Sequence, residues 1–144
     1  MKSLRAACLG ALFFTAAVLL PAEEASTVRG VKAICSAFLK QVVADEYNAA
    51  FDYLKTQPNS ISADNFAELE LLAIQQAGTI REVYGEAIDV RLVKEEMAAD
   101  FVLRLVYVIR RERHIIRWEF IYYKPAAVWK LDAVSFDDEI NGLF

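Results

Sequence analysis

The chain is poor in the residue types on which many catalytic and metal sites depend. Its 144 residues include one histidine, two cysteines, three prolines and five glycines. A zinc site or a Cys–His nucleophile built on His114 would need unusual partners, and His114 lies in or beside the basic turn "RRERH". The few glycines form no phosphate-binding loop, and no serine stands in a nucleophile elbow. The sequence therefore predicts no catalytic residue, no metal site and no cofactor.

The first 22 residues have the order of a secretory signal peptide. Lys2 and Arg5 precede an uncharged run at residues 6–20, and the small residue Ala22 follows it. The run is shorter than the roughly 20 residues that span a bilayer, although an uncleaved anchor is the alternative. Cleavage after Ala22 predicts an exported, periplasmic or extracellular protein that begins at Glu23 and has no stable membrane anchor.

The processed chain is expected to be acidic and to keep a single thiol. The full chain has 16 basic against 20 acidic residues, and the predicted signal peptide contains two of the basic ones and no acidic one. An acidic exported protein with a lone cluster at Arg110, Arg111 and Arg113 is not expected to bind nucleic acid. Cys35 would have no second cysteine to pair with. It falls on the apolar stripe of a helix, which predicts a buried and unreactive thiol.

Hydrophobic spacing predicts two main helical regions. Residues 31–57 contain no Gly and no Pro, and their apolar side chains recur at helical spacing, which predicts one long amphipathic helix. Pro58 ends that pattern, and Ser62 offers the N-cap of a second helix. Gly78 is expected to interrupt this second helix, and Gly85 to end the short helical piece that follows.

From Glu86 onward the hydrophobic period changes to two, which predicts four strands at residues 87–95, 99–110, 114–123 and 127–137. After the signal peptide (1–22) and a polar leader (23–30), residues 31–144 are therefore predicted to form a single α+β domain. Its long N-terminal helix and one or two further helices are expected to pack on a curved, cone-like, four-stranded antiparallel meander.

Alternation sorts the strand side chains into two faces. The face toward the helices is expected to carry Ile88, Val90, Leu92, Leu103, Leu105, Tyr107, Ile109, Ile116, Trp118, Phe120, Tyr122, Trp129, Leu131, Ala133 and Ser135. The outer face is expected to carry a charged row of Asp89, Arg104, Glu119 and Lys130, with Arg117 opposite Asp132. Such cross-strand pairs stabilise a sheet. This register leaves residues 110–113 as a four-residue loop. It also places Val106, Val108, Ile115, Ile121, Val128, Val134 and Phe136 outside.

The chain resembles the nuclear transport factor 2-like superfamily over about residues 30–144. The segments that carry the resemblance are "SAFLKQVVADEYNAAFDYL", "QQAGTIREVYG" and "VWKLDAVSFDD". The superfamily is an α+β cone that includes ketosteroid isomerases, polyketide cyclases and many small secreted bacterial proteins. This chain lacks the short strands that larger members insert between their helices, so it looks more like the small secreted members. The resemblance implies a pocket between the helices and the concave sheet.

Three functions stay open at this point. The first is a non-catalytic exported module that binds a small apolar ligand or a protein partner. For this reading the candidate ligand-binding residues are Tyr107, Trp118, Tyr122 and Trp129, although the same rings could simply fill the core. The second is an isomerase- or cyclase-like enzyme, whose base would have to be an acid such as Asp45, Asp52 or Asp100. The third is a structural homodimer formed through the outer face of the sheet.

Overall fold

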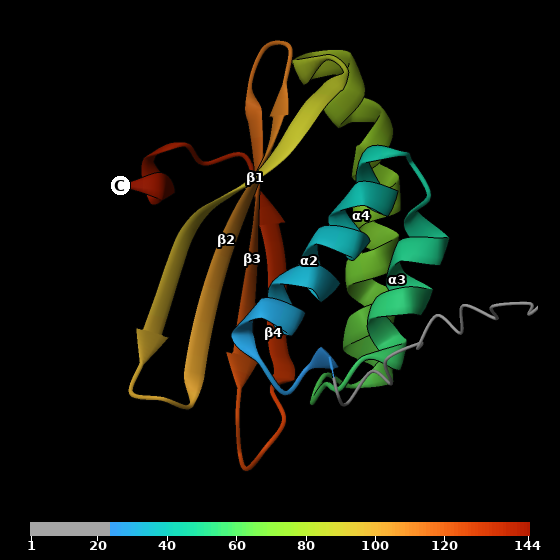
Figure 1. Cartoon of the computed structure of the whole chain (residues 1–144). Coiled ribbons are helices and arrows are strands. Elements are labelled where there is room, and N and C mark those ends of the chain that lie inside the picture. Colours follow the sequence, from blue (N-terminus) through green and yellow to red (C-terminus); the bar gives the residue numbers. More distant parts are fainter. Residues whose placement is uncertain (1–23) are drawn as a thin grey trace, which may run out of the picture.

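The computed structural model describes residues 24–144. The predicted signal peptide and its cleavage point lie outside this range. Three helices, α2 (Val28–Val43), α3 (Tyr47–Thr56) and α4 (Ala63–Tyr84), precede the four strands. The strands are β1 (Ala87–Ala98), β2 (Val102–Arg111), β3 (Ile115–Tyr123) and β4 (Lys130–Asp137), and a short 3-10 helix η1 (Asn141–Leu143) follows. The strands form one antiparallel sheet in chain order, and the helices cover one of its faces (Figure 1), which confirms the predicted α+β class.

The region predicted to be one long helix is a pair of helices that fold back on each other. The chain turns at Asp45, which has a left-handed φ of 61°, a conformation that Asp tolerates better than most residues. As a result the rings of Phe38 in α2 and Phe51 in α3 meet edge to face, 5.2 Å apart. Thirteen residues along a continuous helix would separate these residues by about 20 Å. The expectation of an unbroken helix over residues 31–57 was therefore wrong.

The start of α2 lies within the segment expected to be a polar leader. The Thr27 side chain caps the helix by accepting a hydrogen bond from the Gly30 amide. Ala25 is fully buried, and its carbonyl accepts a hydrogen bond from the backbone N–H of Trp129. Residues from Ala25 onward therefore belong to the packed domain. Within residues 24–144, none of the helices has both the length and the apolar character needed to cross a membrane.

Helix α4 begins and ends where the sequence predicts but is not interrupted. The Ser62 hydroxyl accepts the Asn65 amide at its start, and Gly85 ends it with a φ of 81°. Gly78 lies inside the helix, because a single exposed glycine lowers helix stability without breaking the hydrogen-bond ladder. Only Glu86 separates Gly85 from β1, and the end of α4 lies at the same end of the molecule as the β2–β3 hairpin (Figure 1).

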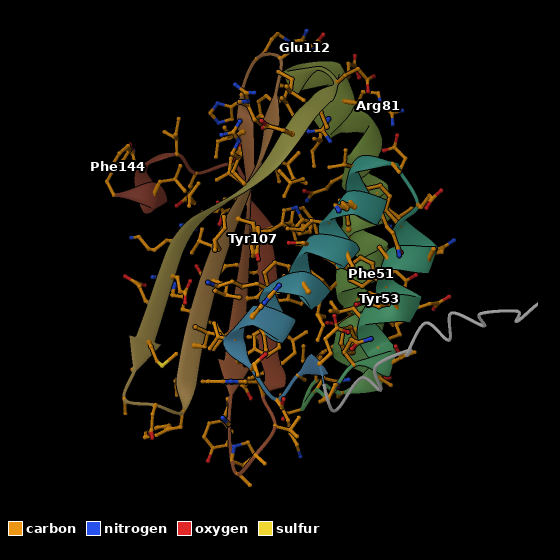
Figure 2. All side chains as sticks on the ribbon, in the orientation of Figure 1. Phe51, Tyr53, Arg81, Tyr107, Glu112 and Phe144 are labelled. Atoms are coloured by element: carbon orange, nitrogen blue, oxygen red, sulfur yellow. The ribbon has the colours of Figure 1, made fainter. Side chains whose placement is uncertain are left out.

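The core lies between the helices and the inner face of the sheet, with Tyr107 of β2 directed toward α2 and Phe51 lying among the helices (Figure 2). The predicted inward residues of β2 and β3 are buried. In β4 the alternation changes, because Asp132 is an extra residue between the pairs Tyr122–Leu131 and Ile121–Ala133. This bulge turns Val134 and Phe136 toward the core instead of outward, and it turns Ala133 and Ser135 to the outside.

Two bulges displace residues of β1 in the same way. Ile88 and Val93 are the extra residues in its pairing with β2. Ile88 is exposed, although it was expected on the inner face, and Val90 packs against the core as predicted. After Val93 the odd-numbered residues of β1 face the helices and the even-numbered residues face outward. Glu95 is therefore on the helix-facing side and forms an ion pair with Lys32 of α2. Long edge strands are commonly bent by bulges in this way.

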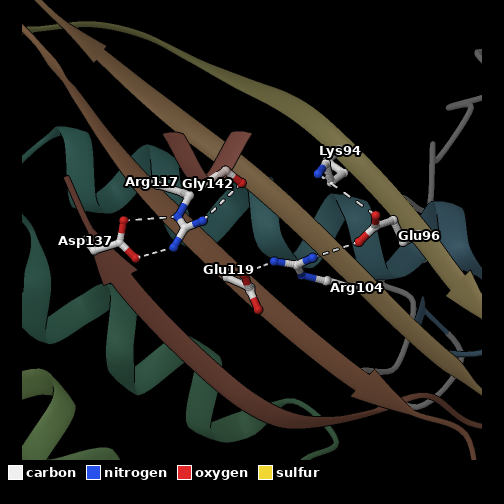
Figure 3. Close-up of polar contacts among 7 residues, drawn as sticks. All are labelled: Lys94, Glu96, Arg104, Arg117, Glu119, Asp137 and Gly142. Carbon is white, nitrogen blue, oxygen red and sulfur yellow. Dashed lines mark hydrogen bonds and ion pairs between the residues drawn. The ribbon is translucent and has the colours of Figure 1, made fainter. Parts of the chain in front are cut away.

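The outer face carries a charged network, but with different partners from those predicted (Figure 3). Arg104 bonds Glu119 as expected, at 2.8 Å, and Glu96 of β1 rather than Asp89, also at 2.8 Å. Asp89 instead pairs with Arg110 at 2.9 Å. Arg117 pairs with Asp137 and not Asp132, and it also donates to the Gly142 carbonyl. The loop between β3 and β4 is longer than predicted, because β4 begins only at Lys130, and the β4 bulge shifts the pairing by one further residue. Glu119 therefore lies opposite Ser135, and Lys130 lies opposite Tyr123.

Candidate functional site

The four aromatic residues predicted to bind a ligand are part of the packed core. At most 3% of the surface is exposed in each of Tyr107, Trp118, Tyr122 and Trp129. The Tyr107 hydroxyl donates to the Lys32 carbonyl, and the Tyr122 hydroxyl lies 3.5 Å from the Cys35 sulfur. Trp118 stacks on Phe136 with the ring centroids 4.7 Å apart. Trp118 also borders a small cavity, and this cavity leads to a different candidate site.

This inner cavity lies between α4 and the helix-facing side of β2 and β3. Its volume is about 10 Å³, close to the space that a single water molecule needs. Its lining consists of Val42, Tyr47, Ala73, Ile80, Ile109, Arg111, Ile116, Trp118 and Phe136. The polar groups that these side chains bring are the Tyr47 hydroxyl, the Arg111 guanidinium and the Trp118 indole nitrogen. The side chains around this space therefore offer mainly hydrogen-bond donors to an atom placed in it.

Arg111 reaches the inner cavity because it continues the inward alternation of Tyr107 and Ile109 along β2. Its exposed fraction is 8%. The Nη1 atom donates to the Gly85 carbonyl at 2.7 Å, at the end of α4, where a cation is favourable. No carboxylate among residues 24–144 lies within ion-pair distance of it. Burial lowers the pKa of Arg111, and the nearby Tyr47 and Glu86 oppose that shift.

Two buried N–H groups on side chains that line the inner cavity have no acceptor among residues 24–144. Within the described residues, neither Nε of Arg111 nor Nε1 of Trp118 has a hydrogen-bond partner. Both side chains line the same cavity. A guanidinium and an indole nitrogen only donate, so the complementary group is an oxygen that accepts. Buried polar groups are nearly always paired, so this combination marks the cavity as a place where an acceptor belongs.

A larger crevice opens outside the inner cavity, between α4 and the ends of β3 and β4. It has a volume of about 280 Å³ and is lined by Gln76, Ile80, Tyr84, Ile116, Phe136, Asp137 and Asp138. Ile80, Ile116 and Phe136 line both spaces, so these three apolar side chains form the boundary between them. The lining combines these three apolar side chains with the polar groups of Gln76, Tyr84, Asp137 and Asp138, and small-molecule sites likewise combine apolar walls with a few polar groups.

Polar contacts hold the mouth of the crevice together. The Tyr84 hydroxyl donates to the Asp138 carboxylate, and His114 Nε2 donates to the Asp138 backbone carbonyl at 2.8 Å. The His114 and Tyr84 rings lie 4.8 Å apart. The hydrogen bond to Asp138 raises the pKa of Tyr84. His114, which the sequence places in or beside the basic turn, therefore connects the hairpin to the segment that follows β4.

The acids considered as a catalytic base lie away from this site. Asp45 contacts Arg81, and Asp52 lies 3.7 Å from Lys55. Asp100 is exposed in the turn between β1 and β2. None of the three lines the inner cavity or the crevice. Across residues 24–144, no three side chains of His, Cys, Asp or Glu come together in an arrangement that could hold a metal ion.

Sequence reasoning missed Arg111 because it assigned residues 110–113 to a loop. The structure pairs Arg110 with Ile115, and the Arg111 amide donates to the His114 carbonyl, so the hairpin closes around Glu112 and Arg113. The alternation of β2 could have predicted its position, since Arg111 is two residues after Ile109 and four after Tyr107, both of which face inward. The inward position of Phe136 was missed because it depends on the bulge at Asp132, and the sequence near Asp132 does not predict a bulge.

No protein-family model matches this chain, and neither a curated protein nor a solved structure matches it.

Proposed function

We propose that this protein is an exported, non-catalytic module that binds a small apolar ligand in the crevice. The observation that carries the proposal is an open space of about 280 Å³ with Ile80, Ile116 and Phe136 at its base. Spaces of about 300 to 360 Å³ also open elsewhere on the surface, and the crevice is chosen among them because it shares three apolar side chains with the inner cavity. The order of charge, apolar run and small residue in residues 1–22 supports export.

We also propose that the chain is a reduced member of the nuclear transport factor 2-like superfamily. Helices on one face of a curled, four-stranded antiparallel sheet support this proposal. The α2–α3 turn at Asp45 departs from the single long helix of the resemblance. A fold assignment of this kind does not define a ligand, so the proposed function rests on the crevice and not on the superfamily.

Binding of a protein partner is the second candidate function. It is favoured by the outer side of α4, where Leu71, Leu72 and Ile74 are between 41% and 56% exposed. Exposed apolar side chains that gather on one surface are typical of interaction sites. The outer face of the sheet offers less support for a homodimer. Val106 and Val108 are already buried there, and Phe136 faces the core.

One pair of variants separates the two candidates. Ile80→Gln places an amide at the base of the crevice, and Leu72→Gln places the same group on the outer side of α4. With the naphthalene dye 1,8-ANS as the probe, we expect Ile80→Gln to weaken binding by about tenfold and Leu72→Gln to leave it unchanged. Circular dichroism of both variants checks the fold. The reverse pattern, or a parent protein that does not bind the dye, would reject the crevice as the ligand site.

A further inference from the structure

We propose that the ligand of the crevice is a monocarboxylate, and that one carboxylate oxygen occupies the inner cavity and accepts hydrogen bonds from Arg111 and Trp118. The inference rests on the proposed binding of an apolar ligand and adds the chemistry of its polar end. The apolar body of the ligand would lie in the crevice, against Ile80, Ile116 and Phe136.

The two unpartnered N–H groups define what the cavity accepts. Nε of Arg111 and Nε1 of Trp118 are buried and lack an acceptor among the described residues, and both side chains line a space of about 10 Å³. Neither group can accept a hydrogen bond. The complementary group is therefore an acceptor oxygen, which a buried water molecule or the polar end of a ligand can supply. An oxygen at the end of an apolar ligand would accept hydrogen bonds from both donors, while the rest of the ligand lies in the crevice.

Charge and size favour a carboxylate among the groups that present an oxygen. Arg111 is 92% buried, and its one acceptor within residues 24–144 is the neutral Gly85 carbonyl, although Glu86 also lies near enough to act on its charge. A buried cation is stabilised by an anion. The acids at the mouth are already engaged, Asp137 by Arg117 and Asp138 by Tyr84. A cavity with room for about one water-sized atom suits one oxygen of a planar carboxylate better than a tetrahedral phosphate.

Entry requires the three shared side chains to move. Ile80, Ile116 and Phe136 separate the crevice from the inner cavity. Ile80 is on α4, which continues to the Gly85 turn, and the other two are near the ends of β3 and β4. Ile80 and Phe136 are only partly buried, so their side chains can change rotamer more readily than the buried Ile116.

The test uses the two tryptophans of the chain as matched reporters. Trp118 and Trp129 each give one indole N–H signal in a ¹⁵N-correlated NMR spectrum. The probes are 4-phenylbutyrate, its neutral analogue 4-phenylbutyramide, and acetate. We expect 4-phenylbutyrate to shift the Trp118 signal downfield, as a new hydrogen bond does, and to leave Trp129 in place. The amide should bind about tenfold more weakly, because hydrogen bonds to a charged acceptor are stronger.

Substitutions at two arginines of the same hairpin provide the control. Arg111→Lys keeps the charge and removes the Nε–H group, and it should weaken binding of 4-phenylbutyrate by at least tenfold. Arg113→Lys changes an exposed arginine that donates to the Val83 and Glu82 carbonyls of α4, and it should leave binding unchanged. If Arg111→Lys does not fold, the comparison of acid and amide on the parent protein still decides the question.

The outcomes distinguish the inference from the proposed function. Equal binding of acid and amide, or binding without a Trp118 shift, would overturn the carboxylate assignment and leave apolar-ligand binding intact. Acetate that shifts Trp118 as strongly as 4-phenylbutyrate does would show that the crevice contributes nothing, which contradicts both. No binding of either phenyl compound would also overturn both. A selective Trp118 shift that depends on the phenyl group and on Arg111 supports the inference.

Discussion

At the scale of single residues, burial decides what the polar groups of the core do. Desolvation raises the pKa of the Cys35 thiol to about 12, which the Tyr122 hydrogen bond only partly opposes. A thiol reacts as its thiolate, so Cys35 is inert at neutral pH, and its predicted burial on the α2 stripe is confirmed. Burial likewise raises the pKa of Tyr122 well above its usual range. Cys35 and Tyr122 are therefore core packing residues whose polar atoms stay protonated at neutral pH.

The role of Tyr122 can be tested by removing its ring and its hydroxyl separately. Tyr122→Ala should lower the free energy of unfolding by roughly 3 to 5 kcal/mol, because it empties a site in the core. Tyr122→Phe should cost less than about 1 kcal/mol, because it removes a single hydrogen bond. Urea denaturation measures both values. A small loss for Tyr122→Ala would show that the ring lines an open pocket instead.

At the scale of helices and strands, alternation predicted β2 and β3 well and failed at the bulges. Alternate residues from Leu103 to Ile109 and from Ile116 to Tyr122 face inward as predicted, because unbroken pairing keeps the period at two. In β4 the extra residue Asp132 inverts the remaining positions, and this inversion brings Phe136 to the crevice. Bulges and the turn at Asp45 arise from packing between distant segments. The sequence within four residues of Asp45, Val93 and Asp132 contains no Gly or Pro that could have predicted these features.

The two glycines associated with α4 should respond oppositely to the same substitution. Gly78 is exposed in the helix interior with no atom near an added Cβ, so Gly78→Ala should raise the free energy of unfolding by about 0.5 to 1 kcal/mol. Gly85 has a φ of 81°, and an added Cβ would lie 2.8 Å from Glu112 Cβ. Gly85→Ala should therefore cost more than about 1 kcal/mol. Thermal unfolding compares them. Equal effects would contradict these helix boundaries.

At the scale of the whole molecule, the sheet separates two environments. The outer face carries the network of Arg104, Glu96 and Glu119, with the C-terminal segment that ends at Phe144 on the same side (Figures 2 and 3). The inner face is largely apolar and packed against the helices, apart from the ion pair of Glu95 with Lys32 and the small cavity at Arg111. The crevice lies where α4 and the strand ends diverge, so a ligand can enter there without disturbing the tight packing between α2 and the sheet.

Stability should decline at both extremes of pH. Burial raises the pKa of both Cys35 and Tyr107 to about 12, from 9.0 and 10.0. As the pH rises the unfolded chain loses these protons first, so their stabilisation is present below about pH 9 and is lost toward about pH 12. Hydrogen bonds from Arg110 lower the pKa of Asp89 below 3.8. That contribution is present above about pH 4 and is lost as the pH falls further.

The urea concentration at the midpoint of unfolding, measured across the pH range, tests the predicted loss of stability at both extremes. They should be nearly constant between about pH 5 and pH 8 and lower at both extremes. Cys35→Ala should reduce the loss at alkaline pH, and Asp89→Asn should reduce the loss at acid pH. A midpoint that rises continuously above pH 9 would contradict the burial of these groups.

The location of a bound ligand tests the central claim most directly. Intermolecular nuclear Overhauser effects would be recorded between 4-phenylbutyrate and methyl-labelled protein. We predict contacts from the phenyl ring to the methyl groups of Ile80 and Ile116, at the boundary between the crevice and the inner cavity. Contacts to Leu103 and Leu131 in the core beside Tyr122, or to Leu71 and Leu72 on the outer side of α4, would contradict the assignment of the crevice as the binding site.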